Sequence, residues 1–266
     1  MKRRRKREAK TTRKLLYVVE RDVRLFFQYK VMVIMRAIWF VSQIAFFGLI
    51  ASRMVAVEDY FRYYVGGLSI MTLYSAAIFI GFDIYEEAEH GVFEYLLSLP
   101  VTRRQLVLGR SIGGGLRAFI YVGPLVCISL YVIGIVNPLN FLLALFSLFL
   151  FAFGVSGMSI TLAVVIKSSD RFDILMGVLD ALIVRLSTAM YPLSFVKEAN
   201  PLYGWIANFN PVTFAADLFR WGAGIEAALS FENPLLPFLG IVMFFAFFTF
   251  LGIILYDKTI EGGGWR

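Results

Sequence analysis

Three residues that could bind a metal ion or transfer a proton lie within one short charged segment. Glu86, His90 and Glu94 are spaced four residues apart, so a helix would place them on one face. Carboxylate and imidazole groups in this arrangement are candidate ligands for a divalent cation. The segment offers no second ligand pair, so the exposed polar face of a surface helix is the favoured interpretation.

Other chemistry is limited by the residue inventory. His90 is the only histidine among 266 residues, so a histidine general base has no other candidate. Cys127 is the only cysteine, which excludes an intrachain disulfide and favours a buried packing role. The phosphate-binding motif G-x-x-x-x-G-K-[ST] is absent, and the glycine run 113–115 is interpreted as helix packing. Any ATP-driven process would therefore need its ATPase on another chain.

The composition points to a membrane environment. Hydrophobic residues make up 59% of the chain and the mean hydropathy is +0.73, whereas soluble domains are about 45–50% apolar. A bilayer core of about 30 Å requires apolar runs of about 20 residues. Six segments are predicted to be transmembrane helices: 31–52, 62–82, 112–136, 141–166, 172–193 and 235–256. The predicted fold class is an all-α polytopic membrane protein with six transmembrane helices.

Basic residues predict the orientation. If the chain crosses six times, 19 of its 26 Lys and Arg fall on one side and four on the other. Because basic residues accumulate on the cytoplasmic side, both termini and segment 83–110 are expected to face the cytosol, beneath a plasma membrane. Residues 1–30 are predicted to form a basic tail and an interfacial amphipathic helix, followed by the membrane domain at 31–266. The net charge of +7 comes mostly from this tail, so nucleic-acid binding is not expected.

Polar residues inside the predicted spans are candidates for function. Asp180 and Arg185 lie in the fifth segment, where each would cost about 2.5–3.5 kcal/mol at the bilayer centre. We expect them to face a transport pathway, a partner helix or a second subunit, although Arg185 could equally extend its charge to the membrane surface. Five residues apart, they are about 140° around an α-helix, so a direct pair is not expected. Gln43 in the first segment is a weaker polar contact of the same kind.

The opposite side of the membrane carries helix-start signals. Asn-Pro occurs four times, beginning at positions 137, 200, 210 and 233. Asn as N-cap with Pro at the first helical position predicts a helix start at each. Segment 194–234 is rich in aromatic residues and is predicted to form short interfacial or re-entrant helices, an outer cap. On the cytosolic side, Thr102 and Gln105 form a capping-box pattern.

Two motifs resemble those of a known family. Residues 86–101, EEAEHGVFEYLLSLPV, are similar to the acidic, Gly-Thr, Glu-x-Leu, Pro-Val-Ser pattern that follows the second span in the membrane subunit of type-2 ABC exporters. Residues 208–220, NFNPVTFAADLFR, resemble the Asn-Pro-Leu-Thr-Tyr-x-x-Asp-x-x-Arg signature before the last span of the same family. His90 and Val92 depart from the first pattern, which concerns the details of docking rather than the family.

The resemblance implies a permease that acts as a homodimer or heterodimer above two cytosolic ABC ATPase subunits, which would hold ATP and Mg. It implies no catalytic residue, cofactor or metal in this chain itself. The implied coupling residues are Glu86, Glu89, His90, Gly91, Glu94, Leu97 and Pro100. The implied outer-gate residues are Asn210, Pro211, Asp217 and Arg220. Gln43, Asp180 and Arg185 would line the pathway or a dimer contact.

Two other functions remain open on the sequence. The chain could be an integral membrane lipid-modifying enzyme that uses Glu86, His90 and Glu94 at the inner surface, or a non-catalytic scaffold or channel. For a transporter, the aromatic outer segment favours an amphipathic or hydrophobic small molecule as cargo, with a lipid-linked glycan as the next class. Membrane lipids are expected partners in every case.

Overall fold

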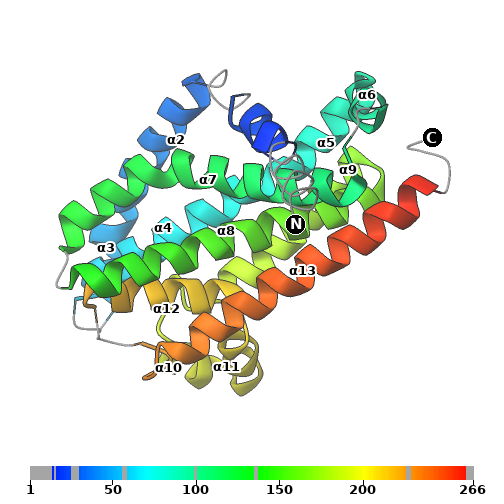
Figure 1. Cartoon of the computed structure of the whole chain (residues 1–266). Helices are drawn as coiled ribbons and strands as arrows, with labels where there is room; N and C mark the ends of the chain where they lie inside the picture. The colour runs from blue at the N-terminus through cyan, green and yellow to red at the C-terminus, as the bar shows by residue number, and fades with distance from the viewer. Residues whose placement is uncertain are drawn as a thin grey trace, which may run out of the picture.

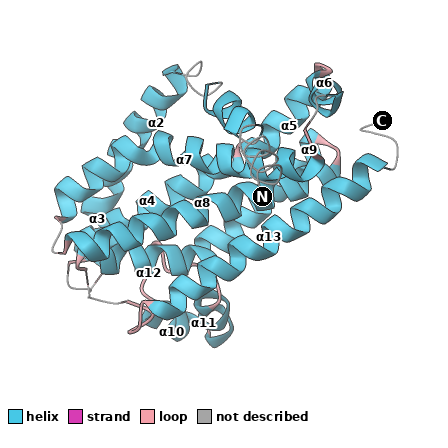
Figure 2. Cartoon of the chain, in the orientation of Figure 1, coloured by secondary structure: helices cyan, strands magenta, loops and turns pink. Residues whose placement is uncertain are grey.

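The chain folds as a bundle of helices, as a computed structural model shows (Figure 1). The structure describes Lys14, 16–24, 30–55, 59–98, 101–134, 137–225 and 229–261. Across these ranges the regular secondary structure is all helical, with no strand (Figure 2). The predicted all-α fold class is confirmed.

Within the described ranges, five helical segments are long and apolar enough to cross a membrane: Ala37–Met54, Tyr60–Glu89, Arg104–Ile133, Pro138–Ile166 and Leu235–Leu255. They correspond to five of the six predicted spans. The helices that build them are α2 (Lys30–Ser42), η1 (Gln43–Gly48), α3 (Leu49–Met54), α4 (Tyr60–Ile78), α5 (Ile80–Glu89), α7 (Arg103–Ile133), α8 (Pro138–Ile166) and α13 (Leu235–Glu261). The protein is therefore a membrane protein.

The predicted fifth span differs from the expectation. Helix α9 (Ser169–Leu179) continues as the π-helix η2 (Asp180–Arg185) and stops there, so the helix ends well before residue 193. Ser187 fixes the stop, because its hydroxyl donates to the Val184 carbonyl at 2.6 Å and accepts from the Ala189 amide at 3.1 Å. With 11 residues in α9 and six in η2, this segment is shorter than the five candidate spans.

Helix α8 is the centre of the bundle. Every residue from 151 to 161 is buried, and α4, α5, α7, α12 and α13 pack around this helix (Figure 1). A helix that is hydrophobic on all sides is stable only where neighbours or lipid cover it completely. The uncharged run that predicted a membrane span therefore also forms the core.

The predicted helix starts are confirmed. Thr102 and Gln105 form a reciprocal capping box at the start of α7, with N···O distances of 3.0 and 3.3 Å. Asn side chains at 137, 200 and 210 cap α8, α11 (Pro201–Asn208) and α12 (Pro211–Ala223). Asn233 accepts from the amide of Leu235 at the first residue of α13. Helices α10 (Leu193–Ala199), α11 and α12 build the predicted 194–234 segment.

The prediction for Cys127 is wrong. The sequence predicts that this residue is buried, but it is exposed on α7. The reason is that its face of α7 borders an open cavity rather than a closely packed helix.

Candidate functional site

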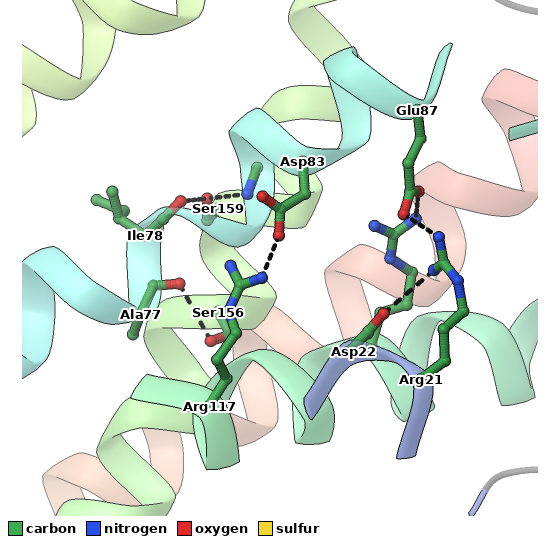
Figure 3. A network of polar contacts seen from close by, with 11 residues as sticks. Arg21, Asp22, Ala77, Ile78, Asp83, Glu87, Arg117, Ser156 and Ser159 are labelled. Carbon is green, nitrogen blue, oxygen red and sulfur yellow. Dashed lines mark hydrogen bonds and ion pairs between the residues drawn. The ribbon is translucent and has the colours of Figure 1, made fainter. Parts of the chain in front are cut away.

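Three helices meet in a polar network at the end of the bundle that carries α6 (Val92–Ser98). They are the N-terminal helix (16–24), α5 and α7, and Figure 3 shows the side chains that connect them. Helix α5 supplies carboxylates at Asp83 and Glu87, one helical turn apart, so both lie on one face.

Glu87 joins all three helices. Its Oε1 accepts from Arg21 of the N-terminal helix at 2.5 Å (Figure 3). Its Oε2 accepts from Arg110 of α7, also at 2.5 Å. Glu87 is 8% exposed and Arg110 is fully buried. Hydrogen bonds between ionised partners are among the strongest in proteins, so this carboxylate fixes how the helices sit.

Asp83 forms a second connection between α5 and α7. Its Oδ2 lies 2.5 Å from Nη1 of Arg117 (Figure 3). The pairs Asp83–Arg117 and Glu87–Arg110 advance in opposite directions along the two helices, as antiparallel neighbours require. We call Arg21, Asp83, Glu87, Arg110 and Arg117 the ionic ladder. It couples one turn of α5 to two turns of α7.

Asp22 is buried beside the ladder. Its Oδ1 lies 3.2 Å from Nη1 of Arg21, and the residue is 2% exposed. Helix α7 makes room for it at Gly113, where a Cβ atom would lie 2.9 Å from the Asp22 Cβ. Burial raises the pKa of Asp22 to about 6, against the opposing effects of Arg110 and Arg21. We therefore expect the docking of the N-terminal helix to depend on pH.

The α4–α5 junction is held by serines of the central helix. The helical pattern breaks at Phe79, which frees backbone groups inside the bundle. Ser159 donates to the Ile78 carbonyl at 2.5 Å and accepts from the Gly81 amide at 3.1 Å. Ser156 donates to the Ala77 carbonyl at 3.2 Å (Figure 3). Helix α8 thus supplies hydrogen-bond partners to the backbone groups at the break. It thereby fixes the direction in which α5 leaves α4.

We call α5, the turn that follows it and α6 the α5–α6 arm. The predicted coupling residues lie at the tip of this arm. Glu86, Glu89 and His90 are exposed, and Gly91 turns the chain from α5 into α6 with a positive φ of 68°. Glu94 and Leu97 are on α6, but their side chains lie outside the described part of the chain, as does all of Pro100.

The exposed polar face of α5 borders a cavity of about 230 Å³, lined by Arg21, Asp83, Glu86, Glu87, His90, Val92 and Arg117. Glu86 and His90 are thus neighbours, as predicted, and His90 Nδ1 lies 2.7 Å from the Glu86 carbonyl oxygen. No group of three metal-ligating side chains occurs among the residues that the structure describes.

The predicted outer-gate residues lie at the other end of the molecule, around α12. Arg220 is fully buried, and its guanidinium carbon lies 3.4 Å from the centroid of the Tyr63 ring. Its Nη2 donates to the carbonyls of Ala189 at 2.9 Å and Tyr63 at 3.2 Å. This arginine therefore binds α12 to α4 and to the turn that follows η2.

Asp217 and Asn210 make further contacts around α12, and we call Asn210, Asp217 and Arg220 the α12 clamp. Asp217 Oδ1 lies 3.5 Å from Arg220 Nη1, and its Oδ2 accepts from the amide of Ser230 at 2.7 Å. Asn210 donates to the carbonyl of Ile183 in η2 at 2.7 Å, while Pro211 is the first residue of α12. Asn210, Asp217 and Arg220 are thus buried, and together they hold α12 against η2, the segment 230–231 and α4.

The prediction that Asp180 and Arg185 do not pair directly is wrong. Arg185 Nε lies 3.5 Å from Asp180 Oδ2, although an α-helix would separate the two side chains. The segment is a π-helix, in which residues five apart are neighbours. Both side chains are accessible, at 69% for Arg185 and 40% for Asp180. Gln43 also begins a π-helix, η1, and its Oε1 accepts from the Tyr64 hydroxyl at 3.4 Å.

Sequence reasoning missed most of the polar residues in the interior. Asp22 was hidden in the apolar face of an amphipathic helix, and Arg110 and Arg117 were counted only for topology. The four-residue spacing of Asp83 and Glu87 and the seven-residue spacing of the two arginines could have predicted facing charged stripes. Tyr63 gave no signal, because nothing in its sequence context marks a partner for Arg220.

Comparison with protein families supplies the deciding observation. Residues 13–223 match the model of the ABC-2 type transporter family. The matched range holds the N-terminal helix, the ionic ladder and the α12 clamp. The chain belongs to the ABC-2 type transporter family. As an ABC-2 type transporter protein it is a membrane component of a transport system and not itself the catalyst. No curated individual protein matches it.

Proposed function

We propose that the chain is the permease subunit of an ATP-driven exporter, coupled through its α5–α6 turn to a separate cytosolic ABC ATPase. One observation carries the proposal: exposed Glu86, Glu89 and His90 stand at the tip of an arm whose base is tied by ion pairs to the N-terminal helix and to α7. An exposed tip can meet a partner protein. A rigid base can pass the partner's movement into the bundle.

The contacts define a path for that movement. A push on the α5–α6 turn acts on α7 through Glu87–Arg110 and Asp83–Arg117, and on α8 through Ser159. Because only Phe79 separates α4 from α5, the same push reaches the far end of α4, where Tyr63 contacts Arg220. ATP can drive transport only if its binding favours one arrangement of these helices over the other.

The α12 clamp suits an outer gate in this scheme. Residues 183–189 are bound by Asn210 and Arg220 of α12, and Gly67 of α4 lies directly beneath Ala189. A Cβ at Gly67 would lie 1.7 Å from the Ala189 carbonyl oxygen, so the turn and α4 are in direct backbone contact. A shift of α4 would therefore move the turn and α12 with it.

Dimerisation explains the accessible charged pair. An Asp180–Arg185 pair facing hydrocarbon would be costly, so we propose that η2 faces a second permease subunit or the pathway between two subunits, together with Gln43. In this arrangement α9 and η2 form the fifth of six crossings, and both termini lie in the cytoplasm below the plasma membrane. The cargo is an amphipathic or hydrophobic small molecule, with lipid-linked cargo as the alternative class.

Charge reversal at the exposed tip tests the coupling. Tagged protein is purified in mild detergent from its own cells, and the partner is accepted only if it has an ATP-binding cassette sequence and hydrolyses ATP. Glu86→Arg with Glu89→Arg should abolish recovery of that partner while leaving the permease intact. Glu198→Arg, which reverses an exposed charge on α10, is the matched control. Equal recovery with all three proteins would reject the docking role.

A further inference from the structure

A second cavity, which shares no lining residue with the first, lies inside the membrane-spanning part of the bundle. It has a volume of about 200 Å³ and lies between α4, α7 and α8. Its walls include Ile70 and Leu73 of α4, Phe119 and Val126 of α7, and Phe141 and Leu148 of α8. All three helices belong to candidate membrane spans.

The sequence of α7 explains why the cavity exists. Pro124 lies within the helix and cannot donate a backbone hydrogen bond, which favours a local bend. Gly123 precedes it, and no heavy atom lies within 4 Å of the position that a Cβ would take there. One turn later, Cys127 adds only a small side chain to the same wall. Helix α7 therefore leaves space that its neighbours do not fill.

The walls accept only apolar groups. Among the described residues of the lining, Ser69 carries the one hydroxyl, which lies 2.7 Å from the Ser129 hydroxyl. Ser69 and Ser129 also approach the carbonyls of Val65 and Leu125, each at 3.0 Å. Both hydroxyls are thus occupied, by each other across the two helices and by carbonyls of their own helices. Apolar cavities of about 150 Å³ in proteins stay free of water and bind hydrocarbon ligands.

The cavity is continuous with the surface that contacts lipid. Cys127 is exposed, and apolar side chains beside it on α7 and α8, including Ile120, Leu142 and Phe146, are exposed as well. The stretch 119–130 falls inside the candidate span Arg104–Ile133, at the depth of the hydrocarbon core. The medium at the opening is therefore the hydrocarbon of the bilayer.

We propose that this cavity is a binding site for one acyl chain of a bilayer lipid, which enters between α4, α7 and α8 past Gly123 and Cys127. The headgroup stays outside, because the walls offer it no polar partner. The site is separate from the coupling arm and does not depend on an ATPase. An ABC-2 type transporter with such a site would carry a resident lipid against its third and fourth crossings.

Photo-crosslinking in vesicles tests the site. The full chain is reconstituted in phosphatidylcholine that contains a small fraction of an analogue with a diazirine in its acyl chain, and adducts are mapped by mass spectrometry. We expect adducts on 119–130 and 141–148 to saturate at a low fraction of the analogue. Adducts on Met243 and Phe247, which are exposed on α13 away from this cavity, should rise in proportion to it.

Filling the cavity provides the matched variant. Gly123→Leu should lower the saturable adducts several-fold, because the new side chain occupies the entrance. Gly177→Leu on α9 is the control, since a Cβ there also meets no atom within 4 Å. Proportional labelling at both places, or equal adducts in both variants, would overturn the proposal.

The single cysteine gives an independent measurement that needs no variant. In delipidated wild-type protein in detergent, added lysophosphatidylcholine should slow alkylation of Cys127 by N-ethylmaleimide several-fold. An unchanged alkylation rate would contradict occupation of the cavity by a lipid chain. Because no ATPase takes part, failure here would leave the proposed permease function untouched.

Discussion

Glu87 and Arg110 form a buried ion pair with an O···N distance of 2.5 Å, and this pair connects α5 to α7 below the exposed α5–α6 turn. Burying two charges costs much of what their attraction returns, so such a pair contributes little net stability. Removing one partner is different, because a charge then remains buried without its counter-charge. The pair is thus better suited to fixing the position of α5 than to stabilising the fold.

Loss of the Glu87 carboxylate should therefore be severe. Glu87→Gln leaves an excess of buried positive charge next to Arg21 and Arg110, and we expect a loss of about 3–5 kcal/mol in the free energy of unfolding. Asp83→Asn should cost less, because 24% of the Asp83 side chain is exposed against 10% for Glu87. Thermal unfolding in detergent measures both, and Glu20→Gln, at an exposed position, is the control. A larger effect for Asp83 would contradict this ranking.

The α4–α5 junction should loosen when its serine is removed. Ser159→Ala deprives both the Ile78 carbonyl and the Gly81 amide of their partner, at a cost of about 1–3 kcal/mol. Hydrogen exchange of the α5 amides should accelerate. Ser156→Ala removes only one hydrogen bond and should have a smaller effect on the same amides. Equal exchange in the two variants would mean that Ser159 does not hold the junction.

Contact between α4 and the turn after η2 predicts a third outcome. Gly67→Ala would force a Cβ onto the Ala189 carbonyl oxygen, so the turn must move away from α4 and from Arg220. We expect a lower melting temperature and faster alkylation of a cysteine placed at Tyr191 in a Cys127→Ser background. Gly177→Ala has open space and should change neither quantity. A tolerated Gly67→Ala would show that the contact is dispensable.

Docking of the N-terminal helix should depend on pH through Asp22. Its pKa is raised by burial from 3.8 to about 6, so the docked helix is stabilised by protonation. That contribution is complete below the unfolded pKa and disappears as the pH rises through about 6, a difference of about 3 kcal/mol. Distances between spin labels at Tyr17 and Arg104, both exposed, should shorten on acidification. Asp22→Asn should stay docked across the range, and unaltered pH dependence in this variant would exclude Asp22 as the cause.

Apolar runs and capping motifs in the sequence predicted the helices that are determined by hydrophobicity and by local hydrogen bonds. Charge-free apolar runs predicted α8 and α13, and Asn-Pro pairs predicted the starts of four helices. The sequence could not predict η2, because a π-helical turn depends on tertiary contacts such as Asn210 with Ile183. Asp22 was missed for a similar reason. Its burial depends on Gly113, which is distant in sequence.

In the proposed function, ATP acts on this permease through the α5–α6 arm. The most direct measurement is alkylation of a cysteine at Tyr191, in a Cys127→Ser background, in the complex with its ATPase with and without ATP and Mg. We predict that ATP changes the rate several-fold, and that Asp83→Ala with Glu87→Ala removes this change while the ATPase stays bound. A rate that ignores ATP, or an ATP response that survives loss of both carboxylates, would contradict it.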